Sequence, residues 1–363
     1  ADVRVDVDFE GTDYPLGDLL FDVGGVRIGF EICEDAWVAH RPGAELSRDG
    51  VDVILNPSAS HFAFGKQEVR RRFVLEGSRA FTVGYVYSNL LGNESGRAIY
   101  DGGALIASGG KMLAVGSRFS FEEVVLTTAV LDVEATRMAR ARTGSFKPDL
   151  LDDDAPRLLR APFNWPARLP APATTETAAW EQSPHLKEEE FTRAVTLALF
   201  DYLRKSRSRG FVVSLSGGAD SAAVALLSAL ALRMAHRELG AEEFRQRLSY
   251  APQAAGSMEE VVRHMLITAY QATRNSGEVT ANAARQVAEA AGARHYEFDV
   301  DSLVQDYISL VEQALERPLS WKTDDLALQN VQARVRSPSV WMLANIEGAL
   351  LLSTSNRSDA VVG

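Results

Sequence analysis

The chain has 363 residues, of which 46% are hydrophobic and 24% charged, and its formal net charge is −11. These values are typical of a globular protein with enough apolar material for two domains, and they exclude collagen-like and disordered chains. The acidic balance argues against a nucleic-acid groove, which needs a concentrated basic surface. The single cysteine excludes an internal disulfide framework and fits a reducing compartment. Because no apolar run reaches the roughly 18 residues that cross a bilayer, we expect a cytoplasmic protein without a membrane or nucleic-acid partner.

Residues 1–160 predict a strand-rich α/β domain, because short apolar runs alternate with turn clusters. The runs are V-R-I-G-F-E-I, V-D-V-I-L, F-T-V-G-Y-V-Y, G-A-L-I-A and V-V-L-T-T-A-V-L. Gly109 and Gly110 stand between two such runs and predict a hairpin turn. Cys33 ends one strand run and residues 56–60 end the next, so both would lie at one edge of the sheet. A polar pocket beside a thiol favours a nucleophile, although a lone cysteine is usually a small buried hydrophobe.

Residues 161–185 are rich in proline and predict an extended linker. Residues 186–363 then predict a second domain in which helices and strands alternate, the pattern of a doubly wound parallel sheet. The expected helices lie near residues 188–207, 221–234, 280–291, 303–315 and 335–347. The expected strands are F-V-V-S-L, H-Y-E-F-D-V and A-L-L-L-S-T.

A glycine turn, S-L-S-G-G-A-D-S, follows the strand F-V-V and predicts a phosphate site. The turn after a parallel strand opens toward the positive end of the next helix, where phosphates bind. The glycines let backbone amides approach and permit positive φ, while the serines supply hydroxyl groups. The residues expected to contact phosphate are Ser214, Ser216, Gly217, Gly218 and Ser221. Asp220 would repel a phosphate unless a divalent cation lay between them, so it is expected to ligate magnesium; the alternative is a tight turn with an aspartate N-cap.

The pattern S-G-G-x-D-S resembles the pyrophosphate loop of the N-type ATP pyrophosphatases. This resemblance implies that the second domain binds ATP with Mg²⁺, adenylates a substrate oxygen and releases pyrophosphate. It also accounts for the loop having no lysine. Phosphate loops that transfer the γ-phosphoryl group need a lysine at the β- and γ-phosphates, whereas a loop that holds departing pyrophosphate can use amides, hydroxyls and magnesium.

The stretches G-F-E-I-C-E-D-A-W and N-P-S-A-S resemble the nitrilase superfamily, and in particular the glutamine amidohydrolase domain of glutamine-dependent NAD synthetases. The stretches L-L-G-N-E-S-G-R-A-I-Y-D-G-G and T-T-A-V-L-D-V-E resemble the same domain. The resemblance implies a nitrilase-like αββα sandwich in which Cys33 attacks the amide of glutamine, with Glu34 and Ser60 in the glutamine pocket. The base and lysine of that family precede the cysteine, and no lysine occurs before Cys33. We therefore expect a partial chain that lacks the amino-terminal part of this domain.

The carboxyl-terminal stretches L-Q-N-V-Q-A-R-V-R and L-S-T-S-N-R-S-D-A-V-V-G resemble the NAD synthetase domain. The resemblance implies that Arg334 and Thr354 contact nucleotides, that Asp359 shares the magnesium, and that the chain stops before the family's lid. Arg334 and Arg336 could instead cap a helix or pair with Asp324 and Asp325. The G-x-C-x-G elbow of GMP synthetase and the amino-terminal cysteine of asparagine synthetase do not occur here.

Together these resemblances imply an enzyme that amidates deamido-NAD with ATP and with ammonia released from glutamine at Cys33. Transfer of ammonia between two sites without loss to water suggests a tunnel and hence a homo-oligomer. Another glutamine-dependent amidotransferase that uses the same loop on a different substrate is an open alternative. A catalytically inactive scaffold that retains both folds is a second alternative.

Overall fold

The computed structural model describes residues 4–94, 96–149, 157–167 and 177–354. The chain divides into two compact units, residues 1–194 and 195–363. Both are α/β, as the sequence predicts. Within the described residues, no helix combines the length and the apolar character needed to cross a membrane.

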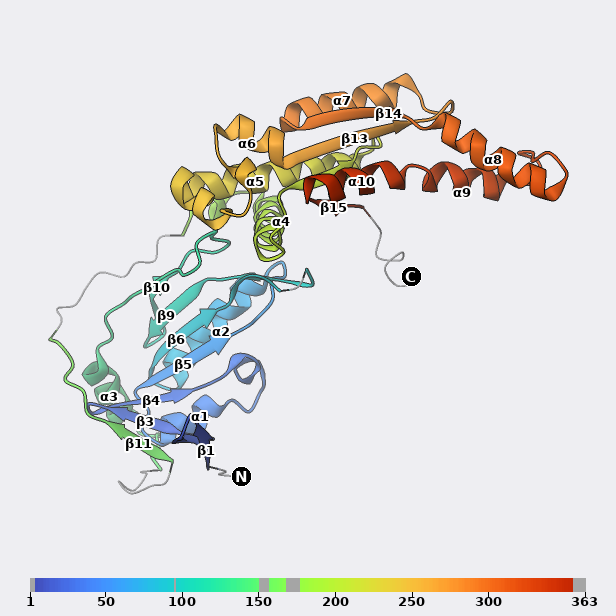
Figure 1. The fold of residues 1–363 in the computed structure, drawn as a ribbon. Helices are drawn as coiled ribbons and strands as arrows, with labels where there is room; N and C mark the ends of the chain where they lie inside the picture. Colours follow the sequence, from blue (N-terminus) through green and yellow to red (C-terminus); the bar gives the residue numbers. More distant parts are fainter. Residues whose placement is uncertain (1–3, 95, 150–156, 168–176, 355–363) are drawn as a thin grey trace. The chain divides into compact units, whose positions relative to one another are not determined.

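The first unit is built on a seven-stranded mixed sheet with the order β10-β9-β6-β5-β4-β3-β11 (Figure 1). Its strands are β3 (Leu20–Val23), β4 (Val26–Phe30), β5 (Val53–Ser58), β6 (Gly84–Asn89), β9 (Ala104–Ser108), β10 (Lys111–Val115) and β11 (Leu158–Ala161). β4, β5 and β6 pair in parallel, so their carboxyl ends meet at one edge. β9 and β10 form the predicted hairpin, with positive φ at Gly109 and Gly110. The described residues supply one sheet of the expected sandwich.

Two smaller hairpins and a set of helices complete the first unit. The hairpins are β1 (Val5–Phe9) with β2 (Thr12–Leu16) and β7 (Leu91–Glu94) with β8 (Ala98–Asp101). The helices are α1 (Pro42–Arg48), α2 (Lys66–Ala80), α3 (Val133–Arg142) and the 3₁₀ helices η1 (Cys33–Trp37) and η2 (Ala179–Gln182). α2 packs against β6, β9 and β10 over a core that contains Ile54, Val74 and Leu105, each with an exposed fraction of 0%. This core holds the strand ends in place.

The run V-V-L-T-T-A-V-L was expected to be a strand, and this prediction is wrong. Residues 122–132 form no strand, and Val124 and Leu126 are 81% and 84% exposed. Val124, Val125 and Thr127 instead line a pocket at the end of β4. Part of the run therefore forms a wall of this pocket, and the run does not pair with the sheet.

Residues 157–167 and 177–185 precede the helix α4 (Leu186–Lys205). Residues 158–161 pair in parallel with β3 as β11, and Trp165 donates a hydrogen bond to the carbonyl of Val23 at 2.8 Å. Trp180 packs against Phe119, with ring centroids 5.8 Å apart. Both tryptophans therefore anchor this segment to the first unit, and the boundary between the two units falls within α4.

The second unit has a four-stranded parallel sheet with the order β14-β13-β12-β15. Its strands are β12 (Phe211–Ser214), β13 (Leu266–Ala272), β14 (Arg294–Asp299) and β15 (Leu350–Leu352). β13 and β14 follow β12 in the sequence and lie on one side of it, whereas β15, the last strand in the sequence, pairs with the other side of β12. The sheet therefore has a switch point between β12 and β15, where ligands of open α/β sheets bind.

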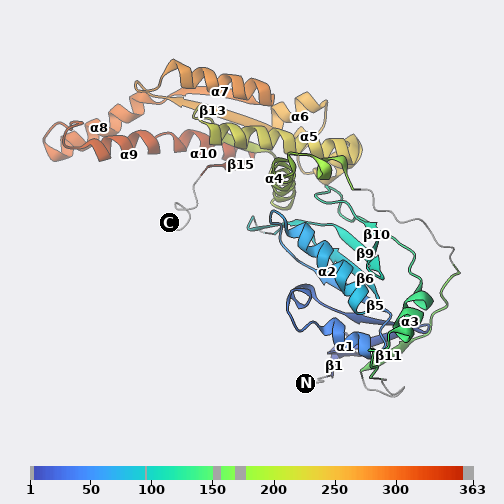
Figure 2. The ribbon, with the colours of Figure 1, turned by 180° about the vertical axis from the view of Figure 1, so that it is seen from behind.

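Helices cover both faces of this sheet. They are α5 (Ala219–Arg247), α6 (Met258–Met265), α7 (Glu278–Ala291), α8 (Asp301–Leu315), α9 (Asp325–Arg334) and α10 (Ser337–Glu347), with the 3₁₀ helix η3 (Pro252–Ala254). Opposite views of the molecule show α5 and α10 on opposite faces of the sheet (Figures 1 and 2). Val212, Ile267 and Val340 form the core beneath α10. This is the predicted doubly wound arrangement.

Several helix limits differ from the predicted ones. α5 extends to Arg247 and is interrupted at Gly240, whose φ of 76° and ψ of 164° are not helical. The helix expected near residues 335–347 begins at Ser337, after the separate helix α9. Pro338 explains that start, because proline fits the first turn of a helix and cannot donate within its interior. α6 and α9 were not predicted.

A buried carboxylate anchors the end of β4. Glu31, with an exposed fraction of 0%, lies between Arg41 Nη2 at 2.7 Å and the hydroxyl of Tyr85 at 2.6 Å. The backbone amide of Gly43 donates to the same carboxylate at 2.7 Å. A Cβ added at Gly43 would lie 2.6 Å from Glu31 Oε1, so glycine is required for this contact. Burial and the Glu31 charge raise the pKa of Tyr85, which keeps its hydroxyl neutral and donating.

Replacing Glu31 with glutamine is expected to destabilise the first unit by about 3 kcal/mol, because it leaves the Arg41 guanidinium without its buried counter-charge. Urea denaturation of wild type and Glu31→Gln measures this loss. Glu76→Gln is the matched control, because Glu76 pairs with Arg79 on the surface, where ion pairs contribute little. A Glu31→Gln protein as stable as the control would show that the buried pair does not stabilise the fold.

Candidate active site

Cys33 occupies a strained backbone position at the carboxyl edge of the first sheet. It follows β4 by three residues, begins the 3₁₀ helix η1, and has a φ of 51°. The left-handed region costs a residue other than glycine roughly 1–2 kcal/mol, and such strain is found more often at functional sites. The side chain is intermediate in exposure and forms no disulfide. The thiol is therefore placed at a turn and remains accessible.

A pocket of about 630 Å³ opens at Cys33. Ser58 at the end of β5 and Asn89 at the end of β6 lie on its wall, as the parallel pairing of these strands requires. The residues that line it are Ile32, Cys33, Pro57, Ser58, Ala59, Ser88, Asn89, Leu90, Leu91, Gly102, Gly103, Ala104, Ser117, Glu123, Val124, Val125 and Thr127. The pocket combines an apolar wall with hydroxyl, amide and carboxylate groups, which suits a small polar substrate.

Glu34 and Ser60 lie near this pocket without being among the residues that line it. Glu34 is exposed in η1, directly after the cysteine. Ser60 is 5% exposed, and its backbone N–H donates to Asn89 Oδ1 at 2.8 Å. The structure therefore brings Ser60 against a pocket residue and leaves Glu34 at the surface.

Lys66 is a cationic residue near Cys33 that the sequence reasoning missed. It begins α2, and its Nζ donates to the carbonyl of His61 at 3.0 Å and lies 5.5 Å from the ring centroid of Trp37, the last residue of η1. Burial lowers the pKa of Lys66, with a further contribution from Arg70. No motif in the sequence marks Lys66, because only the fold brings the start of α2 to η1.

The glycine turn of the second unit lies between β12 and α5. Gly217 has a φ of 80°, and a Cβ there would meet the carbonyl of Thr280 at 2.5 Å, so this position requires glycine. Gly218 is the N-cap of α5 with a φ of −93°, and it does not use the positive φ that was expected of it. The first amides of a helix have no intrahelical partners. Gly218 therefore ends the loop at the positive end of a long helix.

Hydroxyl groups hold this loop in shape. Ser221 Oγ accepts from the backbone N–H of Ser216 at 3.2 Å and donates to the carbonyl of Gly218 at 3.1 Å. The hydroxyl of Ser216 lies 3.2 Å from that of Ser221. The backbone N–H of Gly218 donates to Ser216 Oγ at 3.3 Å. Both serines therefore fix the loop itself, and the amides of Gly217 and of the first turn of α5 are the groups left to face a ligand.

Asp220 is exposed in the first turn of α5. The helix is capped by Gly218, so the alternative in which Asp220 serves only as the N-cap is wrong. The described residues offer no group of three metal-ligating side chains here or elsewhere. A magnesium ion at phosphates usually needs only one or two carboxylates in addition to the phosphate oxygens, so a single free carboxylate beside the loop fits that ion.

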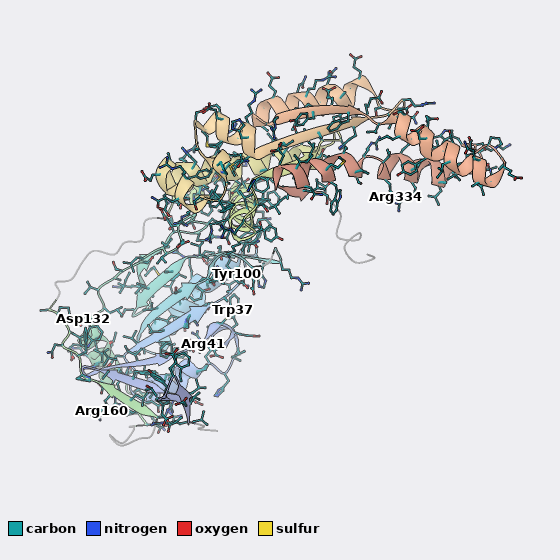
Figure 3. The ribbon with its side chains drawn as sticks, in the orientation of Figure 1. Trp37, Arg41, Tyr100, Asp132, Arg160 and Arg334 are labelled. Carbon is teal, nitrogen blue, oxygen red and sulfur yellow. The ribbon has the colours of Figure 1, made fainter. Side chains whose placement is uncertain are left out.

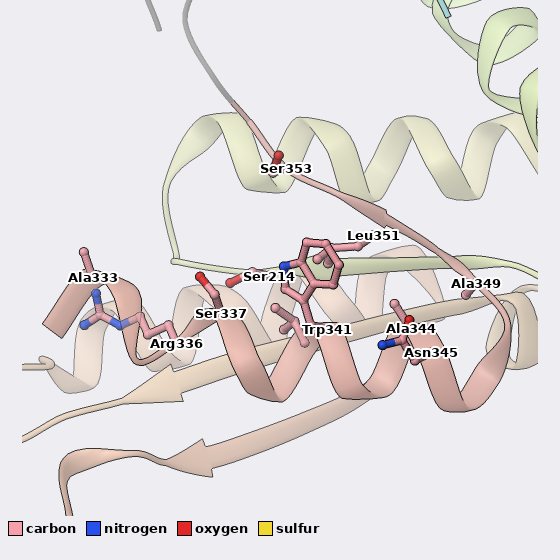
Figure 4. A pocket seen from close by; sticks show the side chains of 11 residues that line it. Ser214, Ala333, Arg336, Ser337, Trp341, Ala344, Asn345, Ala349, Leu351 and Ser353 are labelled. Atoms are coloured by element: carbon pink, nitrogen blue, oxygen red, sulfur yellow. The ribbon is translucent and has the colours of Figure 1, made fainter. Parts of the chain in front are cut away.

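A second pocket, of about 660 Å³, lies at the switch point of the second sheet (Figure 4). It lies between α10 and the ends of β12 and β15, with Ser214, Arg336 and Ser353 on its wall. Its other lining residues are Ala333, Ser337, Val340, Trp341, Ala344, Asn345, Ala349 and Leu351. Of the residues expected to bind ATP, Ser214 is the one on this wall.

A buried amide lies beside this pocket. The hydroxyl of Ser214 donates to Gln271 Oε1 at 2.9 Å, and Gln271 is 4% exposed. Gln271 Nε2 has no hydrogen-bond partner among the described residues. Arg336 Nε donates to the backbone carbonyl of Gln271 at 3.3 Å. Since buried polar groups are normally paired, the free donor of Gln271 suits a polar ligand at this edge, and sequence reasoning did not find it.

The remaining predicted residues lie apart from these contacts. Arg334 is exposed at the end of α9 (Figure 3), and Thr354 is exposed after β15. Neither lines the second pocket. The suggested pairing of these arginines with Asp324 does not occur, because Asp324 pairs with Arg317 at 2.8 Å. Asp359 lies outside the described residues.

Comparison with known proteins supports the predicted fold of both units. The NAD synthase family model matches residues 191–363. The glutamine-dependent NAD(+) synthetases of Macaca fascicularis and Saccharomyces cerevisiae are 31% and 29% identical to the chain, and each alignment covers 96% of the chain and 52% of the relative. The chain thus spans about half the length of the curated relatives that it matches.

Two solved structures are similar over the whole chain. A glutamine-dependent NAD(+) synthetase from Cytophaga hutchinsonii is 39% identical with a TM-score of 0.75, and the match covers 100% of this chain and 54% of that one. The structure of such a synthetase from Acinetobacter baumannii in complex with ADP is 20% identical with a TM-score of 0.62 and shares the fold, with coverage of 100% and 52%. The first unit is thus nitrilase-like and the second has the ATP pyrophosphatase fold. The chain is thus similar to glutamine-dependent NAD(+) synthetases over almost its whole length, and residues 191–363 match the NAD synthase family.

Proposed function

We propose that the protein amidates deamido-NAD to NAD, with ATP as the activating substrate and with ammonia released from glutamine at Cys33. The observation that carries this proposal is the S-G-G-A-D-S loop at the carboxyl end of a parallel strand, beside the pocket at the sheet's switch point. The strained cysteine at the edge of the first sheet supports the glutamine half. The direct test is to measure NAD formed from deamido-NAD and ATP with either glutamine or ammonium.

In the first unit, the thiolate of Cys33 attacks the side-chain amide carbon of glutamine. A carbon–sulfur bond forms, the carbon–nitrogen bond breaks, and ammonia leaves with one added proton. Water then cleaves the glutamyl thioester to give glutamate and restore the thiol. Ser58, Asn89 and the neighbouring Ser60 orient the substrate, with Glu34 at the entrance.

In the second unit, the amides of Gly217 and of the first turn of α5 bind the phosphates of ATP, and Gly218 caps α5 so that these amides face the ligand. The loop serines hold these amides in position, and Arg334 and Thr354 bind nearby parts of the nucleotides. Asp220 would hold Mg²⁺, with Asp359 as a second ligand. When bound, this ion neutralises charge on the pyrophosphate as it leaves.

The nicotinate carboxylate of deamido-NAD attacks the α-phosphorus of ATP, and pyrophosphate leaves. Ammonia then attacks the acyl carbon of this adenylate, AMP leaves with the carboxylate oxygen, and the amide of NAD remains. The loop binds the pyrophosphate, and Gln271 Nε2 offers a buried donor to the nucleotide at the same edge. The role of the protein is to place the two reacting groups and to stabilise the developing charge.

We further propose a homo-oligomer located in the cytoplasm. Free ammonia must pass from one reaction to the other without loss to water, which an enclosed path within an assembly would allow. The single cysteine among 363 residues suits a reducing compartment.

Replacing Cys33 with alanine is expected to abolish NAD synthesis with glutamine and to preserve most of the synthesis with ammonium, because only the thioester step needs sulfur. The two rates are measured on the intact protein with saturating deamido-NAD and ATP. Cys33→Ser is a size-matched companion that should behave in the same way. Equal loss with both nitrogen sources would contradict the glutaminase role of Cys33.

Replacing Asp220 with asparagine is expected to lower pyrophosphate release about 100-fold with either nitrogen source, because the amide keeps the shape of the side chain and removes the charge that binds the cation. The magnesium concentration needed for half-maximal rate should rise as well.

Asp325→Asn is the control for Asp220→Asn, since Asp325 is also an acid in the first turn of a helix of the same unit. It should leave the rate and the magnesium dependence unchanged. A normal rate and an unchanged magnesium dependence for Asp220→Asn would show that Asp220 does not hold the ion.

A further inference from the structure

The backbone of Ser60 is held by side chains from two other elements. Asn89, at the end of β6, accepts from Ser60 N–H at 2.8 Å and donates to the Ser60 carbonyl at 3.0 Å. Arg70, in α2, donates to the same carbonyl at 2.7 Å. The position of Ser60 beside the Cys33 pocket is therefore set by two side chains.

Asp101 holds both of these side chains. It ends β8, directly after Tyr100 (Figure 3). Its Oδ1 accepts from Arg70 Nη1 at 2.7 Å and from Asn89 Nδ2 at 3.1 Å. The Arg70 and Asp101 side chains are 0% and 1% exposed. Because a buried charge without its partner is costly, Arg70 and Asn89 can keep these positions only while Asp101 keeps its own.

Arg118 connects Asp101 to two further carboxylates of the first unit. Its Nε donates to Asp101 Oδ2 at 3.2 Å, and its Nη2 donates to Glu190 Oε1 in α4 at 2.7 Å. Its Nη1 lies 3.4 Å from Glu181 Oε2 in η2. The Arg118 side chain is 2% exposed and lies over the ring of Trp180. Each of the three guanidinium nitrogens of Arg118 thus contacts a carboxylate. Glu190 binds the nitrogen of Arg118 that does not contact Asp101 or Glu181.

We propose that Asp101 is a positioning residue of the glutamine pocket, and that Arg118 makes its position depend on Glu190. Asp101 acts through Arg70 and Asn89, which fix the backbone of Ser60 at the edge of the pocket. Loss of the Asp101 charge would leave the thiol in place while displacing the groups that orient glutamine. This inference rests on the proposed glutaminase activity at Cys33.

The test compares Glu190→Gln with Glu189→Gln in the intact protein. Both changes remove one carboxylate charge at neighbouring positions of α4, but Glu190 binds Arg118 whereas Glu189 pairs with Arg193. Glu190→Gln is expected to raise the KM for glutamine about fivefold, with kcat changed less. Glu189→Gln should match wild type. Asp101→Asn, which removes the central charge, should lower kcat/KM for glutamine about 100-fold.

Two further readouts separate positioning from a loss of folding. In the Glu190→Gln and Asp101→Asn proteins, NAD synthesis with ammonium should stay at the wild-type rate. Alkylation of Cys33 by iodoacetamide should also keep its rate, while labelling by the glutamine analogue 6-diazo-5-oxonorleucine should slow. Equal loss with ammonium, equal slowing of both reagents, or an unchanged KM for glutamine in Glu190→Gln would each overturn the positioning role.

The proposed function has a separate test. A wild-type protein that makes no NAD from either nitrogen source would refute the proposed synthetase activity. A wild-type protein that uses ammonium and glutamine, together with variants of unchanged glutamine kinetics, would refute the positioning role alone.

Discussion

Parallel strand pairing is the constraint on which both sites depend. In the first unit, Ser58 of β5 lies opposite Asn89 of β6, and β4 pairs with β5 in the same direction, so the chain leaves all three strands at one edge. In the second unit, Val213 lies opposite Leu352, which brings Ser214 beside Ser353. Parallel strands deliver the residues that follow them to a common edge. Residues far apart in the sequence are therefore gathered by backbone hydrogen bonds.

Where strands end at such an edge, polar groups become buried and need hydrogen-bond or charge partners. The first unit meets this need with buried carboxylates that each bind an arginine. Glu31 binds Arg41 below the Cys33 turn, and Asp101 binds Arg70 and Arg118 beside the pocket. A buried ion pair of this type adds little net stability compared with apolar packing, but breaking it is costly. Arrangements of the strand ends that separate a pair would leave a buried charge without a partner, so these pairs favour the one arrangement in which both partners meet.

The sequence was sufficient for the fold class and for the motifs, because strand alternation, turn glycines and helical spacing are local signals. Gly217 illustrates this, since a strand, two glycines and a helix in succession predict a loop with positive φ, and Gly217 has a φ of 80°. Gly218 adopts an ordinary φ, because it is already the cap of α5. The sequence could not distinguish these two roles.

Features that depend on contacts between distant segments could not be predicted. The apolar run over residues 124–131 predicts a strand, yet it forms none, and Val124, Val125 and Thr127 line a pocket instead. Only the completed sheet determines which of these outcomes occurs. Lys66, Gln271 and Asp101 carry no motif and gain their roles from neighbours on other elements. The helix α9 went unpredicted because its apolar face is narrow, with Leu328 as its buried residue.

The net charge of −11 and the proposed binding of anionic nucleotides are compatible, because electrostatic interactions in salt are local. At physiological ionic strength, screening limits them to about 8 Å, so acidic residues elsewhere on the chain have little effect at the loop. Within that range the loop offers backbone amides and the positive end of α5, a 29-residue helix. Arg336 adds a cation on the wall of the neighbouring pocket. An acidic chain can therefore present a local site for phosphate, and the carboxylate of Asp220 in the first turn of α5 is a group that would call for a cation there.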